Sequence, residues 1–174
     1  MKYLVKFFVV TFFFILSTHS FAEQKIVVLD MKYVLNSSKA GKDAQEFLKK
    51  TFNDNSKKFS DLEKALKEEE TDLLAKKNIL SKEEYGKKMN SLREKNINYQ
   101  KDRRSALDKI TTYRAEARAT LLKKLKPILQ SYIKENNVSL LIDKKYILGG
   151  GTENDITEVI VEKLNKELPS LNLK

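Results

Sequence analysis

The sequence contains no cysteine, no tryptophan, one histidine and two prolines among its 174 residues. Without cysteine, the chain can form no disulfides, thiolate nucleophiles or cysteine-based metal sites. Glycine is also scarce, at five residues, whereas 33% of the chain is charged. A high charged fraction with so few helix-breaking residues is typical of long solvated helices rather than of a compact globule.

The first 22 residues are typical of a secretory signal peptide. Lys2 and Lys6 precede an apolar run at residues 7–16, and small residues stand at Ser20 and Ala22. This order predicts an exported protein that is cleaved after Ala22. The alternative is a membrane anchor, but ten residues at about 1.5 Å each are too short to cross a hydrocarbon core of about 30 Å.

Removal of this segment changes the charge and the available chemistry. It takes away two of the 34 basic side chains and none of the 24 acidic ones, so the net charge falls from +10 to +8. It also takes away His19, the only histidine. A chain without His or Cys has no Ser-His triad and no usual zinc site. We therefore expect neither an enzyme nor a bound cofactor or metal.

Residues 44–117 predict a long antiparallel helical hairpin. Apolar positions recur in alternating steps of four and three along residues 48–80 and again along 85–117, as in coiled-coil seams. Between the two series, Ser81 and Glu84 form a capping-box pattern that starts a new helix. If the chain reverses near residues 78–84, Phe52 faces Tyr113, Leu66 faces Tyr99, and Glu69 faces Asn96.

The remaining residues predict a small α/β body from residues 23–43 and 118–174. Residues 25–29, 138–142 and 146–148 are short apolar runs and are predicted strands. Residues 37–41 predict a break, and Asp155 is the predicted N-cap of a last helix that ends at Pro169. Three short strands bury little surface. The fold class is therefore mainly α with a small β body, and we expect that body to oligomerise.

The sequence resembles the Skp/OmpH family of periplasmic chaperones, and the resemblance spans the whole chain after the signal peptide. The segments that carry it are residues 27–31 with 34–35, residues 38–41, residues 140–144 and residues 155–157. The resemblance implies a jellyfish-like homotrimer in which three helical hairpins surround a cavity. It further implies an ATP-independent holdase that binds unfolded outer-membrane proteins. Anionic lipid or lipopolysaccharide is a further implied partner, to which no residue of this chain can be assigned.

A holdase needs charge and weak apolar contacts rather than catalytic groups. Basic residues near the predicted hairpin tip are candidates for attracting acidic clients. They are Lys76, Lys77, Lys82, Lys87, Lys88, Arg93 and Lys95. The alternative is an ordinary solvated face in which Glu83 pairs with Lys87 and Glu84 pairs with Lys88.

Apolar residues away from the predicted seam are candidates for client contact. They are Phe47, Leu74, Ile79, Ile97 and Leu107. Scattered apolar residues are also normal on any protein surface. The seam residues, including Phe52, Phe59, Tyr99 and Tyr113, are predicted to be buried between the helices.

Other functional classes stay open at this stage. An exported coiled-coil linker of the cell envelope would explain the hairpin, but it leaves the strands and the last helix without a role. A basic nucleic-acid-binding protein would require that the signal peptide is misread. Because an exported protein meets little nucleic acid, we do not expect it as a partner.

Overall fold

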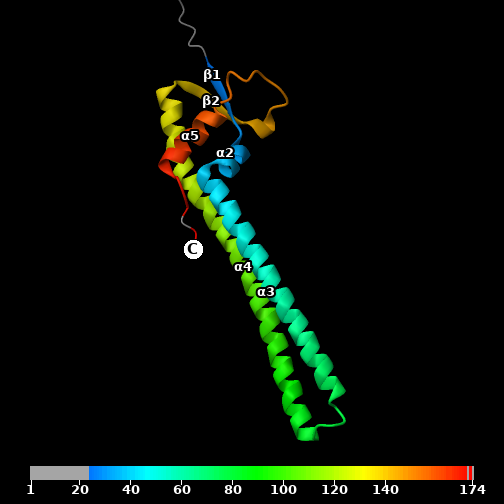
Figure 1. The fold of residues 1–174 in the computed structure, drawn as a ribbon. Coiled ribbons are helices and arrows are strands. Elements are labelled where there is room, and N and C mark those ends of the chain that lie inside the picture. Colours follow the sequence, from blue (N-terminus) through cyan, green and yellow to red (C-terminus); the bar gives the residue numbers. More distant parts are fainter. Residues whose placement is uncertain (1–23, 172, 174) are drawn as a thin grey trace, which may run out of the picture.

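The computed structural model describes residues 24–171 and 173, so the predicted signal peptide lies outside the described residues. The protein is mainly helical with a small two-stranded sheet. Figure 1 shows a small body at one end and two long helices that extend from it. The elements in chain order are β1 (Lys25–Leu29), α2 (Met31–Ser37), α3 (Lys39–Ala75), α4 (Lys82–Glu135), β2 (Val138–Asp143), the 3-10 turn η1 (Lys144–Tyr146) and α5 (Thr157–Glu167).

The helices α3 and α4 have 37 and 54 residues and lie side by side in opposite directions (Figure 1). Residues 76–81 join them. The side chain of Ser81 accepts from the Glu84 backbone N–H, and the Glu84 carboxylate accepts from the Ser81 N–H. The predicted capping box is thereby confirmed, and it starts α4 at Lys82. The part of α3 and α4 within residues 44–117 is called the arm below.

The sheet joins the two ends of the chain. β1 and β2 pair in parallel, with Ile26 opposite Leu140 and Leu29 opposite Asp143. Parallel strands need a long crossover connection, and here α2, α3 and α4 together provide it. The strands predicted at 25–29 and 138–142 are thus confirmed.

The third predicted strand, at residues 146–148, is wrong. Tyr146 ends the 3-10 turn, and Ile147 N–H donates to the Lys144 carbonyl at 3.0 Å instead of to a neighbouring strand. The second edge of β1 is covered by another segment. Val28 N–H donates to Asn154 O at 2.8 Å, and Ile156 N–H donates to Val28 O at 2.9 Å. A single bridge between Val28 and Asp155 therefore replaces the expected strand.

The hydrophobic core lies where α2, α5 and the last turns of α4 meet the inner face of the sheet. Its fully or almost fully buried members are Val27, Leu29, Val34, Leu125, Ile160 and Leu164. Because all of these lie in the body, the arm projects from a base that has its own core.

A polar cluster fixes α5 beside β1. The Asp30 backbone N–H donates to the buried Thr157 hydroxyl at 2.9 Å, and that hydroxyl donates to Asp155. Asp155 also accepts from Lys144 Nζ at 2.7 Å and from the Thr157 N–H at 3.0 Å. Burial raises the pKa of the Asp155 carboxyl, but these hydrogen bonds outweigh it and hold that pKa below its ordinary value. Asp155 was the predicted N-cap of α5; the structure places Ile156 there, without a side-chain cap.

The corner between α2 and α3 is tight. The predicted break at residues 37–41 is confined to Ser38, because α2 ends at Ser37 and α3 begins at Lys39. The fully buried Ser38 hydroxyl accepts from the Gly41 N–H at 3.2 Å and caps α3. A methyl group at Gly41 would overlap the carbonyl oxygen of Leu35, so this corner requires glycine.

Candidate functional site

The arm is held together by a thin line of buried side chains. α3 supplies Leu48, Phe59 and Leu73, and α4 supplies Leu92, Tyr99, Ile110 and Ala117. Most other side chains of the arm are exposed. A two-helix contact of this kind buries little apolar area, so the arm is stabilised less strongly than the body.

The register of the arm differs from the predicted pairs. Tyr99 was predicted to face Leu66, but its ring packs edge-on against Phe59 with centroids 6.0 Å apart. The Tyr99 hydroxyl donates to Glu63 at 3.1 Å. Burial, followed by the effect of Glu63, raises the pKa of Tyr99. α3 ends at Ala75 and α4 begins at Lys82, so the chain reverses around residues 78 and 79, earlier than the predicted pairs require. A heptad repeat alone does not fix this register.

Two further pairs deviate in the same way. Tyr113 packs against Phe47, with ring centroids 5.6 Å apart, rather than against Phe52. Glu69 accepts from Lys95 at 2.7 Å instead of pairing with Asn96. The α3 partner of each tyrosine therefore lies closer to the N-terminus than expected. Phe47, predicted to lie off the seam, is half-buried within it.

We expect a double-mutant cycle to separate the two registers. Phe59→Ala and Tyr99→Ala should show a coupling energy of about 1 kcal/mol, because edge-to-face ring pairs contribute about 0.5–1.5 kcal/mol beyond their burial. Leu66→Ala and Tyr99→Ala serve as the control and should be nearly additive. Urea unfolding of each variant gives the four free energies. A larger coupling for the Leu66 pair would contradict the structure.

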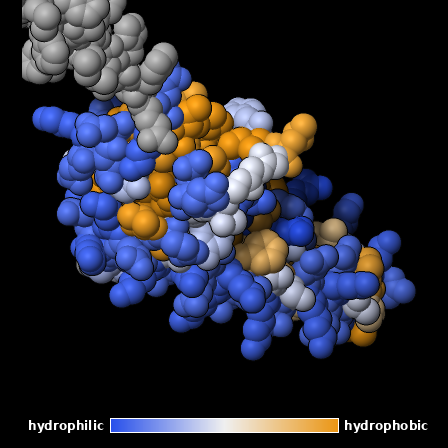
Figure 2. Space-filling view, turned by 90° about the horizontal axis from the view of Figure 1, so that it is seen from above, coloured by the Kyte–Doolittle hydropathy of each residue, from blue (hydrophilic) through white to orange (hydrophobic). Residues whose placement is uncertain are grey.

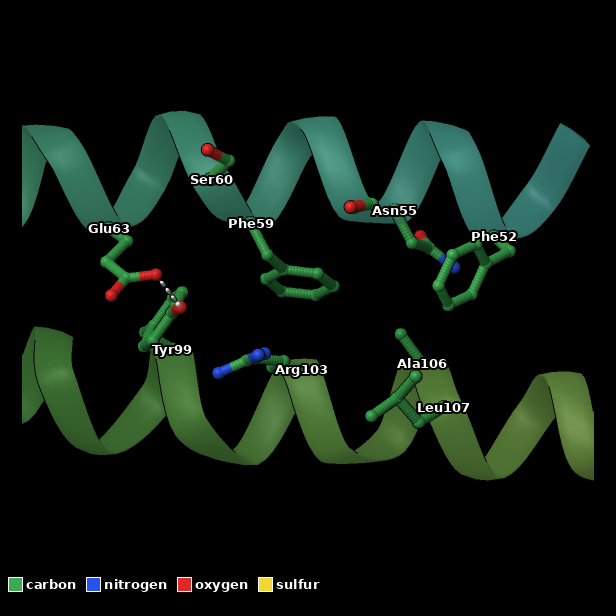
Figure 3. A pocket seen from close by; sticks show the side chains of 10 residues that line it. Phe52, Asn55, Phe59, Ser60, Glu63, Tyr99, Arg103, Ala106 and Leu107 are labelled. Atoms are coloured by element: carbon green, nitrogen blue, oxygen red, sulfur yellow. Dashed lines mark hydrogen bonds between the residues drawn. The ribbon is translucent and has the colours of Figure 1, made fainter.

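A hollow of about 220 Å³ lies between the helices in the middle of the arm. Figure 3 shows Phe59 and Tyr99 pointing into it from opposite helices, with Arg103 beside them. Phe52 and Leu107 lie together at one end of it (Figure 3). These two side chains are 52% and 49% exposed, so apolar surface is open to solvent here.

Phe52 is a functional candidate that the sequence reasoning missed. Its place in the predicted seam led to an expectation of burial, whereas the structure leaves it half exposed. The displaced register gives its expected partner, Tyr113, to Phe47. An exposed Phe beside the exposed Leu107 is suited to apolar contact with another chain.

The other apolar candidates are exposed at separate points along the arm. Leu74 lies near the C-terminus of α3, Ile79 is 81% exposed in the turn, and Ile97 lies on α4 between the turn and the hollow. They do not form one patch with Leu107. The structure thus offers several small apolar contacts rather than one deep pocket.

The basic candidates surround the turn. Lys76 and Lys77 lie at the end of α3 and in the turn, and Lys82 begins α4. The remaining four follow along α4: Lys87, Lys88, Arg93 and Lys95.

Two of the basic candidates are held in ion pairs. Lys87 contacts Glu83 at 2.8 Å, and Lys95 contacts Glu69 at 2.7 Å. Hydrogen bonds from Ser81 lower the pKa of Glu84, whose carboxylate serves the cap. One of the two expected pairs, Glu83 with Lys87, is therefore present.

The outward face of the sheet is a second apolar surface. Ile26 and Leu140 lie opposite each other in the register and are 41% and 50% exposed. Val28 and Ile142, the next pair on the same face, are half-buried. Figure 2 looks down on this end of the molecule and shows apolar side chains gathered on a largely hydrophilic surface. Strands of parallel sheets are usually covered on both faces, so this face is suited to a partner.

The described residues, 24–171 and 173, hold neither a metal-binding cluster nor a membrane-spanning helix. The part of the chain that the structure describes contains no group of three or more acidic side chains placed to hold a metal ion. It also contains no helix that is both long and apolar enough to span a membrane. The surfaces described above offer apolar contact and charge.

Comparison with known proteins identifies the family. The family described as outer membrane protein (OmpH-like) matches residues 25–164. A crystal structure of an OmpH-like protein from Caulobacter crescentus CB15, described as a candidate outer membrane chaperone, has a TM-score of 0.80 to this protein. The two are 20% identical, and the match covers 91% of this chain and 94% of that chain. No curated protein sequence matches significantly. Because the family match spans both strands and all of the helices up to Leu164, the chain belongs to the OmpH-like family of outer membrane proteins.

Proposed function

We propose that this protein is an ATP-independent periplasmic holdase that binds unfolded outer-membrane proteins after translocation and prevents their aggregation. The observation that carries the proposal is the arm, on which separate apolar side chains are exposed along a charged surface. Membership in the OmpH-like family supports it, as does the fold shared with a candidate outer membrane chaperone. The protein acts by binding, without catalysis and without a cofactor.

The arrangement of the arm suits reversible binding. Four apolar side chains of the arm are about half exposed or more: Phe52, Ile79, Ile97 and Leu107. Only Phe52 and Leu107 lie close to each other. A buried apolar side chain contributes about 1.5–3 kcal/mol. A few such side chains, each only partly buried by the client, hold an unfolded chain weakly enough for it to be released. Basic side chains around the turn raise the rate at which acidic clients are captured.

We also propose that three copies assemble through the body. The outward face of the sheet carries Ile26 and Leu140, and β2 pairs with β1 alone among the described strands. An edge strand with an apolar face is prone to pairing with another chain. Three copies joined there would place three arms around a common space in which a client is shielded from other clients. The predicted signal peptide is consistent with a periplasmic location.

The direct test is refolding of a urea-unfolded outer-membrane protein by dilution into the purified protein without residues 1–22. We expect one trimer per client to suppress light scattering in the absence of ATP. An unrelated basic helical protein at the same concentration provides the control. Scattering equal to that in buffer alone would refute the holdase function.

Reversal of charge at the turn is expected to weaken the binding of acidic clients by about tenfold at low salt, because each exposed charge contributes up to about 1 kcal/mol. The four substitutions are Lys77→Glu, Lys82→Glu, Lys88→Glu and Arg93→Glu. The loss should shrink as salt rises, since the Debye length falls to about 8 Å at physiological ionic strength. Affinity is measured by fluorescence anisotropy of a labelled client.

The control for this experiment carries the same change of net charge at the other end of the molecule. Its substitutions are Lys123→Glu, Lys124→Glu, Lys126→Glu and Lys134→Glu, all exposed on the body end of α4. It should bind more tightly than the turn variant. Unchanged affinity of the turn variant at low salt would contradict the proposed role of these residues, and equal losses in both variants would assign the effect to net charge alone.

A further inference from the structure

A groove of about 410 Å³ lies where the arm joins the body, between α2, α3 and α4. It is separate from the mid-arm hollow and shares no residue with it. Gly41 and Ala117 line the groove with small side chains, and Leu48 and Leu121 add aliphatic surface. Gln45 Nε2 donates to Asn36 Oδ1 at 3.1 Å, and this bond ties α3 to α2 along one wall.

The other wall carries two positive charges. Arg114 and Arg118 both line the groove, and both are exposed. Neither makes an ion pair with any residue of the described chain, and no acidic residue lines the groove. Guanidinium groups bind carboxylates in a bidentate geometry. The groove is therefore complementary to a negatively charged occupant that also has apolar groups.

The spacing of the two arginines favours an extended peptide. Four residues of helix rise about 6 Å, and two residues of an extended chain advance about 6.6 Å. Two acidic side chains at alternate positions of one strand can thus meet Arg114 and Arg118 together. The residue between them points to the opposite side, toward Leu48 on α3. The strands of outer-membrane barrels alternate between polar and apolar side chains in this way.

We infer that this groove is a second client subsite, which binds an extended segment of alternating acidic and apolar residues. The inference rests on the proposed holdase function and adds the class of peptide that the arm base recognises. Arg114 and Arg118 hold the carboxylates, and the aliphatic wall receives the apolar side chains. Charge around the turn attracts any acidic client, whereas this groove selects client segments in which acidic and apolar residues alternate.

The test uses a short peptide in which Asp and Leu alternate and which carries one Trp. The protein has neither Cys nor Trp. A bimane fluorophore attached at Gln45→Cys is thus quenched by Trp only when the peptide enters the groove. We expect saturable quenching at this position and little quenching for a bimane at Lys124→Cys, which lies outside the groove. A peptide with Asn in place of Asp should bind about tenfold more weakly.

Two matched variants test the arginines. Arg114→Gln with Arg118→Gln should weaken peptide binding by about tenfold, because two exposed charge pairs are lost. Lys123→Gln with Lys124→Gln removes the same charge from the same helix and should change the affinity by less than about twofold. Circular dichroism verifies that both variants keep their helical content. Equal losses in both, or no loss in the arginine variant, would overturn the inference.

A lipid occupant is a separate outcome of the same experiment. If vesicles that contain phosphatidylglycerol quench the Gln45 bimane analogue through a Trp-labelled lipid and the peptide does not, the groove binds an anionic headgroup and the peptide subsite is refuted. Failure of the holdase function is distinguishable from both results. In that case the protein would leave outer-membrane protein aggregation unchanged, whatever the peptide does at the groove.

Discussion

Replacement of Gly41 by Ala is expected to lower the free energy of unfolding by about 2–3 kcal/mol, whereas the same replacement at Gly86 should raise it by about 1 kcal/mol. Both glycines lie inside helices, Gly41 in α3 and Gly86 in α4. Alanine is a better helix former than glycine, so helix propensity alone predicts that both substitutions stabilise the protein. The difference in sign comes from what surrounds each position.

At Gly41 the added methyl group has no room. It would overlap the carbonyl oxygen of Leu35 and would lie 3.0 Å from the Ser38 hydroxyl, which caps α3. A backbone carbonyl cannot rotate away as a flexible side chain can. α2 would have to move from α3, and this movement would displace Val34 and Leu35 from the core. At Gly86 nothing lies within 4 Å of the added methyl group.

Urea unfolding followed by circular dichroism at one protein concentration measures both effects, since assembly makes stability depend on concentration. The Gly86→Ala variant is the control for the general effect of the substitution. A Gly41→Ala variant as stable as the parent would show that the α2–α3 corner yields easily. A Gly86→Ala variant that loses stability would show that this helix surface is covered in solution.

The same glycine illustrates what the sequence could predict. Residues 37–41 contain two serines and a glycine, and this composition predicted a break. The break exists, but only Ser38 departs from helix. The role of Gly41 depends on the approach of a carbonyl from another helix, and no local pattern in the sequence reports such a contact.

The strands likewise show which features local sequence predicts and which depend on tertiary contacts. Residues 25–29 and 138–142 are runs of β-branched and aliphatic residues, and both form strands. Residues 146–148 have a similar composition but do not pair with β1, because residues 154–156 cover that edge of the strand. Asp155 has no β-propensity to reveal this role. A tertiary hydrogen bond, rather than local preference, decided which segment lies there.

For the candidate surface, the sequence predicted two long helices but not which aromatic rings pack against each other. The repeat of four and three predicted two long helices, and both are present as α3 and α4. The repeat placed Phe52 in the seam and Phe47 outside it, but the structure exposes the first and half-buries the second. A shift of about one heptad along α3 exchanges such neighbours without changing the repeat of four and three.

Replacement of Leu140 by Asp is expected to split the proposed trimer into single chains, with affinity between chains lowered by at least about a hundredfold. Leu140 is 50% exposed on the outward face of β2, directly opposite Ile26. In a single chain a carboxylate there stays hydrated, so the substitution costs only part of the strand propensity and contact area of Leu140. In an assembled body it would be buried among apolar side chains without a partner.

Sedimentation equilibrium of the parent and the variant gives the masses. Leu107→Asp is the matched control, because Leu107 is exposed to the same degree but lies on the arm. It should leave the mass unchanged. If Leu140→Asp loses helical content, Leu140→Thr keeps a strand-forming residue and should weaken assembly less without unfolding the body. A parent protein with the mass of one chain would refute the trimer, and a Leu140→Asp variant with the parent's mass would place the interface elsewhere.

The two substitutions together also distinguish protection of a client by enclosure among three arms from protection by contact with a single arm. Leu140→Asp leaves every candidate client residue of the arm in place but removes the neighbouring arms. If clients are protected because three arms enclose them, this variant loses suppression of aggregation while it still binds short peptides. Leu107→Asp keeps the enclosure and removes one apolar contact, so it should bind clients slightly more weakly and still suppress aggregation. Equal suppression by single chains and by the parent would mean that contact with one arm is sufficient.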